Sequence, residues 1–195
     1  MYLLLLCSLT VAAIAIDRFL LYRRASQGAR ALEADVAAAL RKKKLDDVAP
    51  AVKGKDNMVA HLIQSAVDAR AAGEDVPMTL EAVYGEAAML LRARLNYLST
   101  IVTLAPLLGL LGTISGMIQS FSVFNLQAGQ PMAITGGIGE ALIATATGLL
   151  VAIFALVVHT YFAQRMDMML TLLEKTMNTL LAGFAANDGG HSHAS

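Results

Sequence analysis

The chain has 195 residues, of which 56% are hydrophobic and only 15% are charged, and its formal net charge at pH 7 is zero. A soluble domain carries roughly 25% charged residues, so this composition excludes an ordinary soluble protein, and the balanced charge gives no reason to expect nucleic acid as a partner. The apolar residues fall mainly in three blocks, 1–22, 97–124 and 134–163. Since a helix needs about 20 mainly apolar residues to cross a bilayer, we predict an all-α integral membrane protein with three transmembrane helices.

The first block, 1–22, also has the length of a secretory signal peptide. A signal peptide carries its positive charges before the apolar stretch, whereas here Arg18, Arg23 and Arg24 come at the end of the block. This order favours a retained membrane anchor whose N-terminus lies outside the cell membrane.

The basic residues also predict the topology. All but two of the 15 Lys and Arg residues lie between Arg18 and Arg94, and the other two follow the third block. Short segments rich in Lys and Arg stay in the cytoplasm. We therefore place 23–96 in the cytoplasm, 125–133, which has no basic residue, in a short outer loop, and 164–195 in the cytoplasm as a C-terminal helix with a flexible tail.

The cytoplasmic segment has the composition of a helical region. Ala, Leu, Arg and Lys dominate 29–45, and a second helical pattern covers 58–72. Pro50 and Gly54 stand between these patterns and are expected to separate two helices.

The next helix is expected to lead directly into the second span. Gly73 to Pro77 ends the preceding pattern, and Thr79 is the predicted N-cap of the new helix. Between Leu91 and Pro106 the sequence contains neither glycine nor proline. The sequence therefore predicts one long helix that leaves the membrane, and with it two spans that extend into a cytoplasmic helical bundle.

Glu140 is the one acidic residue deep inside a span. A charged carboxylate is costly in hydrocarbon, so such a residue normally faces a bundle interior or a water-filled path. A carboxyl group in surroundings of low dielectric holds its proton more tightly than in water, which permits reversible proton exchange. Helical spacing places Ala144 and Thr147 on the face of Glu140, with Thr145 and Gly148 further around the helix. The pattern favours proton transfer over the alternative, a protonated Glu140 that donates one structural hydrogen bond between helices.

The second span carries a complementary face of small residues. Gly112 and Gly116 form the GxxxG pattern that lets two helix backbones approach closely, and Pro106 lacks a backbone N–H, so it is expected to kink the helix. A connection of about ten residues makes the second and third spans antiparallel neighbours. The residues expected in helix packing are Pro106, Gly109, Gly112, Gly116 and Gly148.

No pattern of an enzyme is present. The run Gly136-Gly137-x-Gly139 lacks the lysine of a phosphate-binding loop, and no Ser/His/Asp grouping or metal-ligand cluster appears in the sequence. We therefore expect a protein that is not an enzyme and that uses no metal and no cofactor.

Two stretches resemble a known family. Residues 105–113 (APLLGLLGT), followed by Gly116-Met117-Ile118, resemble the second span of the MotA/TolQ/ExbB proton-channel family. Residues 139–148 (GEALIATATG) resemble its third-span signature, and the three-span topology is the ExbB/TolQ arrangement. The four spans of MotA proper disfavour a flagellar stator.

The resemblance implies a function and partners. ExbB and TolQ proteins form homopentamers in the inner (cytoplasmic) membrane, with a periplasmic N-terminus, around the single span of an ExbD/TolR-type partner that carries an intramembrane Asp. Proton passage then drives mechanical work on a TonB- or TolA-type protein for envelope or outer-membrane transport. By position, the family's proton-path residues correspond to Glu140, Thr113 and Thr145, and its second-span proline to Pro106. Thr147 stands where the family is usually apolar and adds a hydroxyl to the expected path.

These observations predict an ExbB/TolQ-like scaffold that conducts protons and couples the proton motive force to movement. The alternative is a passive membrane scaffold, in which Glu140 only holds helices together.

Overall fold

The computed structural model describes residues 2–42, 48–126 and 131–191, and within these residues every regular element is a helix. Three helical stretches, within Tyr2–Leu40, Val76–Ser122 and Gly136–Ala186, are long and apolar enough to cross a membrane. The predicted all-α fold with three transmembrane helices is confirmed. The remaining residues of the predicted segments, at 1, 43–47, 127–130 and 192–195, lie outside the described part of the chain.

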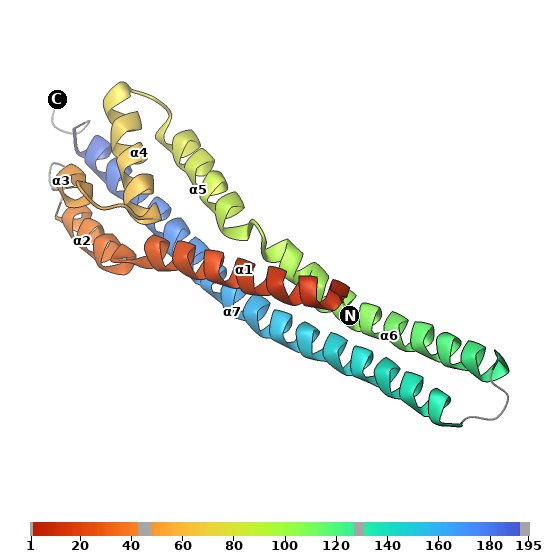
Figure 1. The fold of residues 1–195 in the computed structure, drawn as a ribbon. Coiled ribbons are helices and arrows are strands. Elements are labelled where there is room, and N and C mark those ends of the chain that lie inside the picture. Colours follow the sequence, from red (N-terminus) through yellow and green to blue (C-terminus); the bar gives the residue numbers. More distant parts are fainter. Residues whose placement is uncertain (1, 43–47, 127–130, 192–195) are drawn as a thin grey trace. The chain divides into compact units, whose positions relative to one another are not determined.

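The helices divide between two compact units (Figure 1). The first unit comprises 1–18 and 94–163, and the second comprises 19–93 and 164–195. In chain order the helices are α1 (Tyr2–Ser26), α2 (Ala29–Arg41), α3 (Val48–Val52), α4 (Met58–Ala72), α5 (Val76–Arg92), α6 (Leu95–Leu126) and α7 (Pro131–His191).

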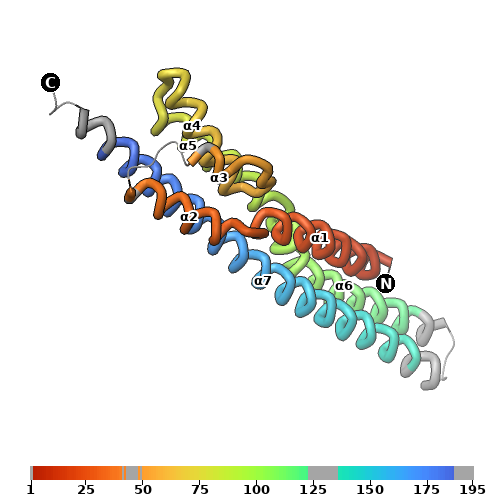
Figure 2. The backbone as a smooth tube through the Cα atoms, turned by 90° about the vertical axis from the view of Figure 1, so that its left-hand side faces the viewer, coloured from red at the N-terminus to blue at the C-terminus, as the bar shows by residue number. Residues whose placement is uncertain are grey.

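The first unit consists of three helices packed side by side: the start of α1, all of α6 and the first part of α7 (Figures 1 and 2). Their shared core is entirely apolar, as expected for contacts within a bilayer. Large apolar side chains such as Leu107, Leu142 and Phe154 point outward and are exposed, which suits a lipid environment. The core residues are Leu4, Val11, Ile14, Leu98, Ile101, Ala105, Val151, Ala152 and Ala155.

In the second unit, α2 and α4 pack against the later part of α7. Lys175 on α7 forms an ion pair of 3.2 Å with Glu33 on α2, whose side chain is buried. The guanidinium of Arg70 on α4 lies 4.7 Å from the ring centre of Phe184 on α7, within the range of a cation–π contact. These contacts add to an apolar core of the second unit, in which Leu32, Leu62, Ile63, Leu80, Leu173 and Leu180 are fully buried.

The start of α5 corrects one prediction. The N-cap is Asp75, whose Oδ1 accepts a hydrogen bond of 3.2 Å from the backbone N–H of Met78. Thr79, the predicted cap, lies inside the helix, and its hydroxyl bonds to the carbonyl of Asp75. The preceding helix, α4, ends at Ala72 with Gly73 as its C-cap, as predicted for the stretch Gly73 to Pro77. Pro77 itself lies in the first turn of α5, where a backbone N–H has no helical partner in any case. Pro50 and Gly54 lie between α2 and α4, as predicted, and Pro50 belongs to the short helix α3 that the sequence did not indicate.

The expected continuous helix into the second span is also wrong, because α5 ends at Arg92 and α6 begins at Leu95. Arg94 has φ of 66°, a left-handed conformation that is uncommon outside glycine. Its Nη1 lies 2.7 Å from Oδ1 of Asp17. On the α5 side, the hydroxyl of Tyr22 donates a hydrogen bond of 2.9 Å to the carbonyl of Leu91, the group that the N–H of Leu95 would bond in a continuous helix. Contacts from α1 therefore stabilise the break between α5 and α6, which contains neither glycine nor proline.

Replacing Tyr22 with Phe tests the contribution of this contact. The buried carbonyl of Leu91 loses its side-chain donor, so the free energy of unfolding should fall by about 1 kcal/mol. The measurement is a denaturant titration in detergent micelles. Tyr97→Phe, at an exposed position, is the control and should leave the midpoint unchanged; equal midpoints for both variants would contradict the assignment.

Candidate functional site

The contact between α6 and α7 is made by residues with little or no side chain. A Cβ atom placed on Gly148 would lie 2.6 Å from the carbonyl oxygen of Ala105 and 2.9 Å from Cα of Gly109. A Cβ on Gly112 would lie 2.7 Å from Cβ of Ala144. The two backbones are therefore closer than side chains of ordinary size allow, as is typical of membrane helices that associate through van der Waals contact.

This contact continues along both helices and defines their direction. Gly116 meets Ala141, with 2.9 Å between the added Cβ and the Cβ of Ala141, and Gly137 packs against Ser120. Residue numbers rise along α6 while they fall along α7, so the helices are antiparallel. We call this contact the glycine seam; its members are Ala105, Gly109, Gly112, Gly116 and Ser120 on α6 and Gly137, Ala141, Ala144 and Gly148 on α7.

The glycine seam divides the helix pair into two edges. Each residue of an α-helix is turned by about 100° from the one before. In an antiparallel pair, the residue before a seam residue lies on the same edge in both helices, and the residue after it lies on the opposite edge. Two observed contacts agree with this rule, since Gly112 meets Ala144 towards one edge and Gly109 meets Thr145 towards the other.

Glu140 and Thr147 lie on one edge, which we call the glutamate edge. Each directly precedes a seam residue, Ala141 and Gly148 respectively, and they stand about 10 Å apart along α7. The hydroxyl of Thr147 donates to the carbonyl of Ile143 in its own helix at 2.8 Å. Ala144, which the sequence places on the same face as Glu140, is buried against Gly112 and leaves no open passage at that point.

Thr113 and Thr145 lie on the opposite edge, which we call the threonine edge. Thr145 donates a hydrogen bond of 3.0 Å across the seam to the carbonyl of Gly109. Thr113 bonds to the carbonyl of Leu110 in its own helix at 2.7 Å. The structure thus brings these two threonines together and separates them from Glu140 within one chain. Pro106 lies within α6, which continues through it as a helix.

The side chain of Glu140 is exposed in the single chain. Within the described residues it forms neither a hydrogen bond nor an ion pair. A structural hydrogen bond between α6 and α7, one of the two roles considered for this residue, is therefore not formed inside the chain.

Two polar residues of α6 that the sequence analysis did not single out also lie on the glutamate edge. Ser115 directly precedes Gly116, and Gln119 directly precedes Ser120, so both share the edge of Glu140. Their helical spacing was visible in the sequence, but their relation to Glu140 required the register of the glycine seam.

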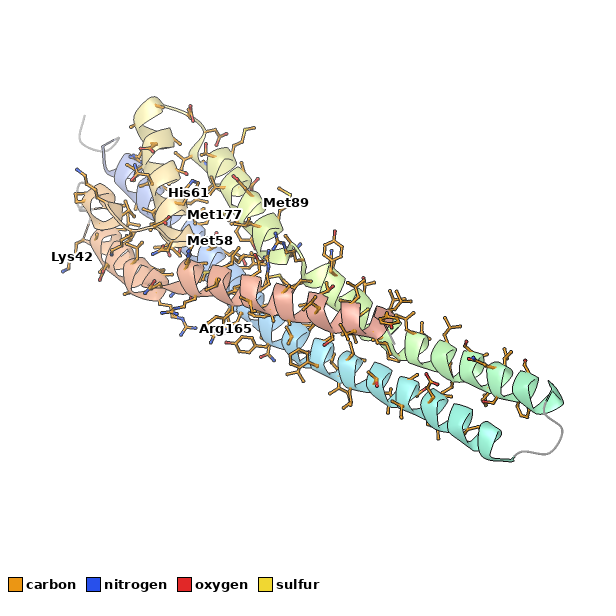
Figure 3. All side chains as sticks on the ribbon, in the orientation of Figure 1. Lys42, Met58, His61, Met89, Arg165 and Met177 are labelled. Atoms are coloured by element: carbon orange, nitrogen blue, oxygen red, sulfur yellow. The ribbon has the colours of Figure 1, made fainter. Side chains whose placement is uncertain are left out.

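The described residues of the second unit include an apolar groove of about 490 Å³ between α4, α5 and α7. Met58, His61 and Met89, labelled in Figure 3, line it. None of the residues predicted for the site belongs to it. Among the described residues, no group of three or more His, Cys, Asp and Glu side chains is arranged to hold a metal ion.

Comparison with known proteins shows which family and which relatives this chain resembles in sequence. The model of the MotA/TolQ/ExbB proton channel family matches residues 51–175. A putative biopolymer transport protein, ExbB-like 1, of Synechocystis sp. is 50% identical over 78 residues, which cover 36% of this chain and 31% of that protein. The Tol-Pal system protein TolQ of Pseudomonas aeruginosa is 34% identical over 108 residues, covering 55% of this chain and 47% of TolQ.

A third relative, the biopolymer transport protein ExbB of Salmonella typhimurium, is 41% identical over 71 residues, covering 36% of this chain and 29% of ExbB. In these three comparisons the chain spans less than half the length of the relative that it matches.

Adding one methyl group at Gly148 tests the glycine seam. In Gly148→Ala the new Cβ meets backbone atoms of Ala105 and Gly109, which cannot rotate away, so we expect a loss of about 1–3 kcal/mol in unfolding free energy. The matched control is Gly139→Ala on the same helix, where nothing lies within 4 Å of the added atom and the higher helix propensity of Ala should be neutral or stabilising. Unfolding in detergent measures both, and a control as unstable as Gly148→Ala would contradict the seam.

Proposed function

We propose that this chain, which belongs to the MotA/TolQ/ExbB proton channel family, conducts protons as the scaffold of an inner-membrane motor. Its three long apolar helices make it a multi-pass membrane protein, and its family is one of membrane channels and not a class of enzymes. In the proposed role the chain couples the proton motive force to mechanical work on an envelope or outer-membrane transport system.

Glu140 carries the proposal. It is the single acidic residue between 95 and 166, it is the tenth residue of α7, within the apolar part of that helix, and its side chain is exposed without a partner among the described residues. A carboxyl group facing acyl chains would be strongly unfavourable, so a group at this depth faces protein or water in the assembled state. These are the surroundings in which a carboxyl group accepts and releases protons.

The polar residues on the two edges of the helix pair support an oligomer as the functional state of the protein. In a ring of identical chains, each helix pair has a neighbour on either side, so residues that lack a partner within one chain find one in the next. By resemblance the ring is a homopentamer, and Thr113 and Thr145 on the threonine edge contribute hydroxyl groups to the same path. The glycine seam keeps α6 and α7 in a fixed register, which holds Glu140 at a constant depth while protons pass.

The proposed partner is an ExbD/TolR-type protein with one span and an intramembrane Asp, acting on a TonB- or TolA-type protein. We place the N-terminus in the periplasm and the basic segment 23–96 in the cytoplasm, in line with the charge distribution. Moving one charge through 100 mV releases about 2.3 kcal/mol, so a few protons supply the energy of an ordinary conformational step.

Replacing Glu140 with Gln tests proton transfer. The amide keeps the size and the donor capacity of a protonated carboxyl group but cannot release a proton, so proton flux should fall to the background while the complex still assembles. The measurement is a pH-sensitive dye in liposomes that contain the chain and its single-span partner, under an imposed potential. Glu86→Gln, at an exposed position on α5, is the control and should conduct normally.

The passive-scaffold alternative makes the opposite prediction. If Glu140 only holds helices together, Glu140→Gln behaves and assembles like the natural chain, whereas Glu140→Leu dissociates the oligomer. Size-exclusion chromatography of both variants, beside the flux measurement, separates the two roles.

A further inference from the structure

Three polar side chains gather on the glutamate edge at similar depth. Gly116 contacts Ala141 across the seam, so the residues just before them, Ser115 and Glu140, lie within about one helical turn of each other. Gln119 follows one turn further along α6. All three are exposed in the single chain.

None of the three has a polar partner among the described residues. Ser115 differs in this respect from the neighbouring hydroxyl groups of α6, because Thr113 bonds to the carbonyl of Leu110 at 2.7 Å and Ser122 to the carbonyl of Ile118 at 2.9 Å. Polar groups in a bilayer need a partner, since hydrocarbon offers none. The glutamate edge therefore faces water or protein in the assembled membrane.

The edge differs on the two sides of Glu140. Towards the end of the pair at Leu126 and Pro131, which we call the loop end, the edge carries Gln119 and Ser122, whereas Ser115 lies about 3 Å to the other side of Glu140 along the helix pair. In the other direction, beyond Thr147, the edge becomes apolar. There Val151 belongs to the core shared with α1, and Leu108 and Val158 pack against that core.

The spacing of the polar residues suits a chain of water molecules. Ser115, Gln119 and Ser122 follow one another at steps of four and three, which places successive side chains about 5–6 Å apart. One water molecule bridges such a distance with two hydrogen bonds of about 2.8 Å each. On the facing helix, Gly136 has no side chain, and nothing lies within 4 Å of the Cβ position, which leaves room for water.

From these observations we propose that protons reach Glu140 from the loop end, through a hydrated path along the glutamate edge in which Gln119 positions water on the way to Glu140 and Ser115 positions water beside its carboxyl group. The apolar core with α1 closes the same edge on the other side of Thr147, so this path gives access from one face of the membrane. The inference rests on the proposed function, which assigns proton transfer to Glu140, and adds the direction of access and two positioning residues.

Cysteine labelling tests whether the path is hydrated, because Cys7 is the only native cysteine and Cys7→Ser provides a background without thiols. In this background, Ser115→Cys and Gln119→Cys should react with a membrane-impermeant maleimide added from the loop side, because thiolates form in water and not in lipid. The matched controls are Ile114→Cys and Ile118→Cys, which precede these positions by one residue and turn away from the edge by about 100°. We expect rates at least tenfold lower for the controls; equal rates at all four positions would overturn the hydrated path.

Proton flux in the same liposomes tests the positioning role. Gln119→Leu removes both polar atoms and should lower the flux at least tenfold, whereas Gln119→Asn should restore much of it because an amide is again present to bind water. Ser115→Ala should lower the flux to a smaller extent. Ile118→Leu is the control and should conduct normally, and size-exclusion chromatography verifies that every variant assembles.

The two proposals fail in different ways. Loss of flux in Glu140→Gln together with normal flux in Gln119→Leu would leave the proposed function standing and overturn the positioning role. Normal flux in Glu140→Gln would overturn the proposed function and, with it, this route to Glu140. Reduced flux in Gln119→Leu without rescue by Gln119→Asn would point to packing and contradict the role assigned to the amide.

Discussion

The close approach of two helix backbones at Gly109 and Gly148 determines the arrangement of the other residues in the first unit. A methyl group at Gly148 would lie within 3 Å of backbone atoms of α6, so this contact exists only because both positions lack a side chain. Lipid tails are as apolar as leucine, and close packing of small residues therefore replaces the hydrophobic effect as the force between membrane helices. Once the seam is set, the register of α6 against α7 is fixed, and every other residue of the pair has a defined edge.

For function, the consequence of this register is that the polar residues of the spans are divided between the glutamate edge and the threonine edge. Thr145 closes the threonine edge with a hydrogen bond to the carbonyl of Gly109, whereas Glu140 remains exposed on the other edge. A protein that needed only a structural hydrogen bond would satisfy it within the helix pair, as Thr145 does. In a bilayer an exposed carboxyl group needs a partner, and the proposed ring of chains with its water supplies one.

The sequence alone is sufficient to predict the three spans and the acidic residue that lies within one of them. The length and hydropathy of three blocks predict three membrane helices, and the depth of Glu140 identifies the proton-transfer candidate. The glycines and Ala144 follow helical spacing, so a small-residue contact is predictable as well. The assignment of Glu140 and Thr145 to opposite edges is not, because it depends on which residues of α6 meet which residues of α7.

Local signals in the sequence were less informative outside the spans. The break after Arg92 contains neither glycine nor proline, and the structure stabilises it through Asp17 and Tyr22, residues distant in the sequence. Thr79, the expected N-cap of α5, lies instead inside the helix, which Asp75 caps. In both cases the helix boundary depends on side-chain contacts in the folded chain, which the composition of the segment alone does not reveal.

The central claim is that the carboxyl group of Glu140 lies in a protein-lined, hydrated space of an assembled complex. An electron cryomicroscopy map of the complex in a lipid nanodisc tests this directly. Our account expects the glutamate edge to face a neighbouring chain, with water density beside Glu140 and Gln119. Acyl-chain density in contact with the Glu140 side chain, and no cavity next to it, would contradict the account.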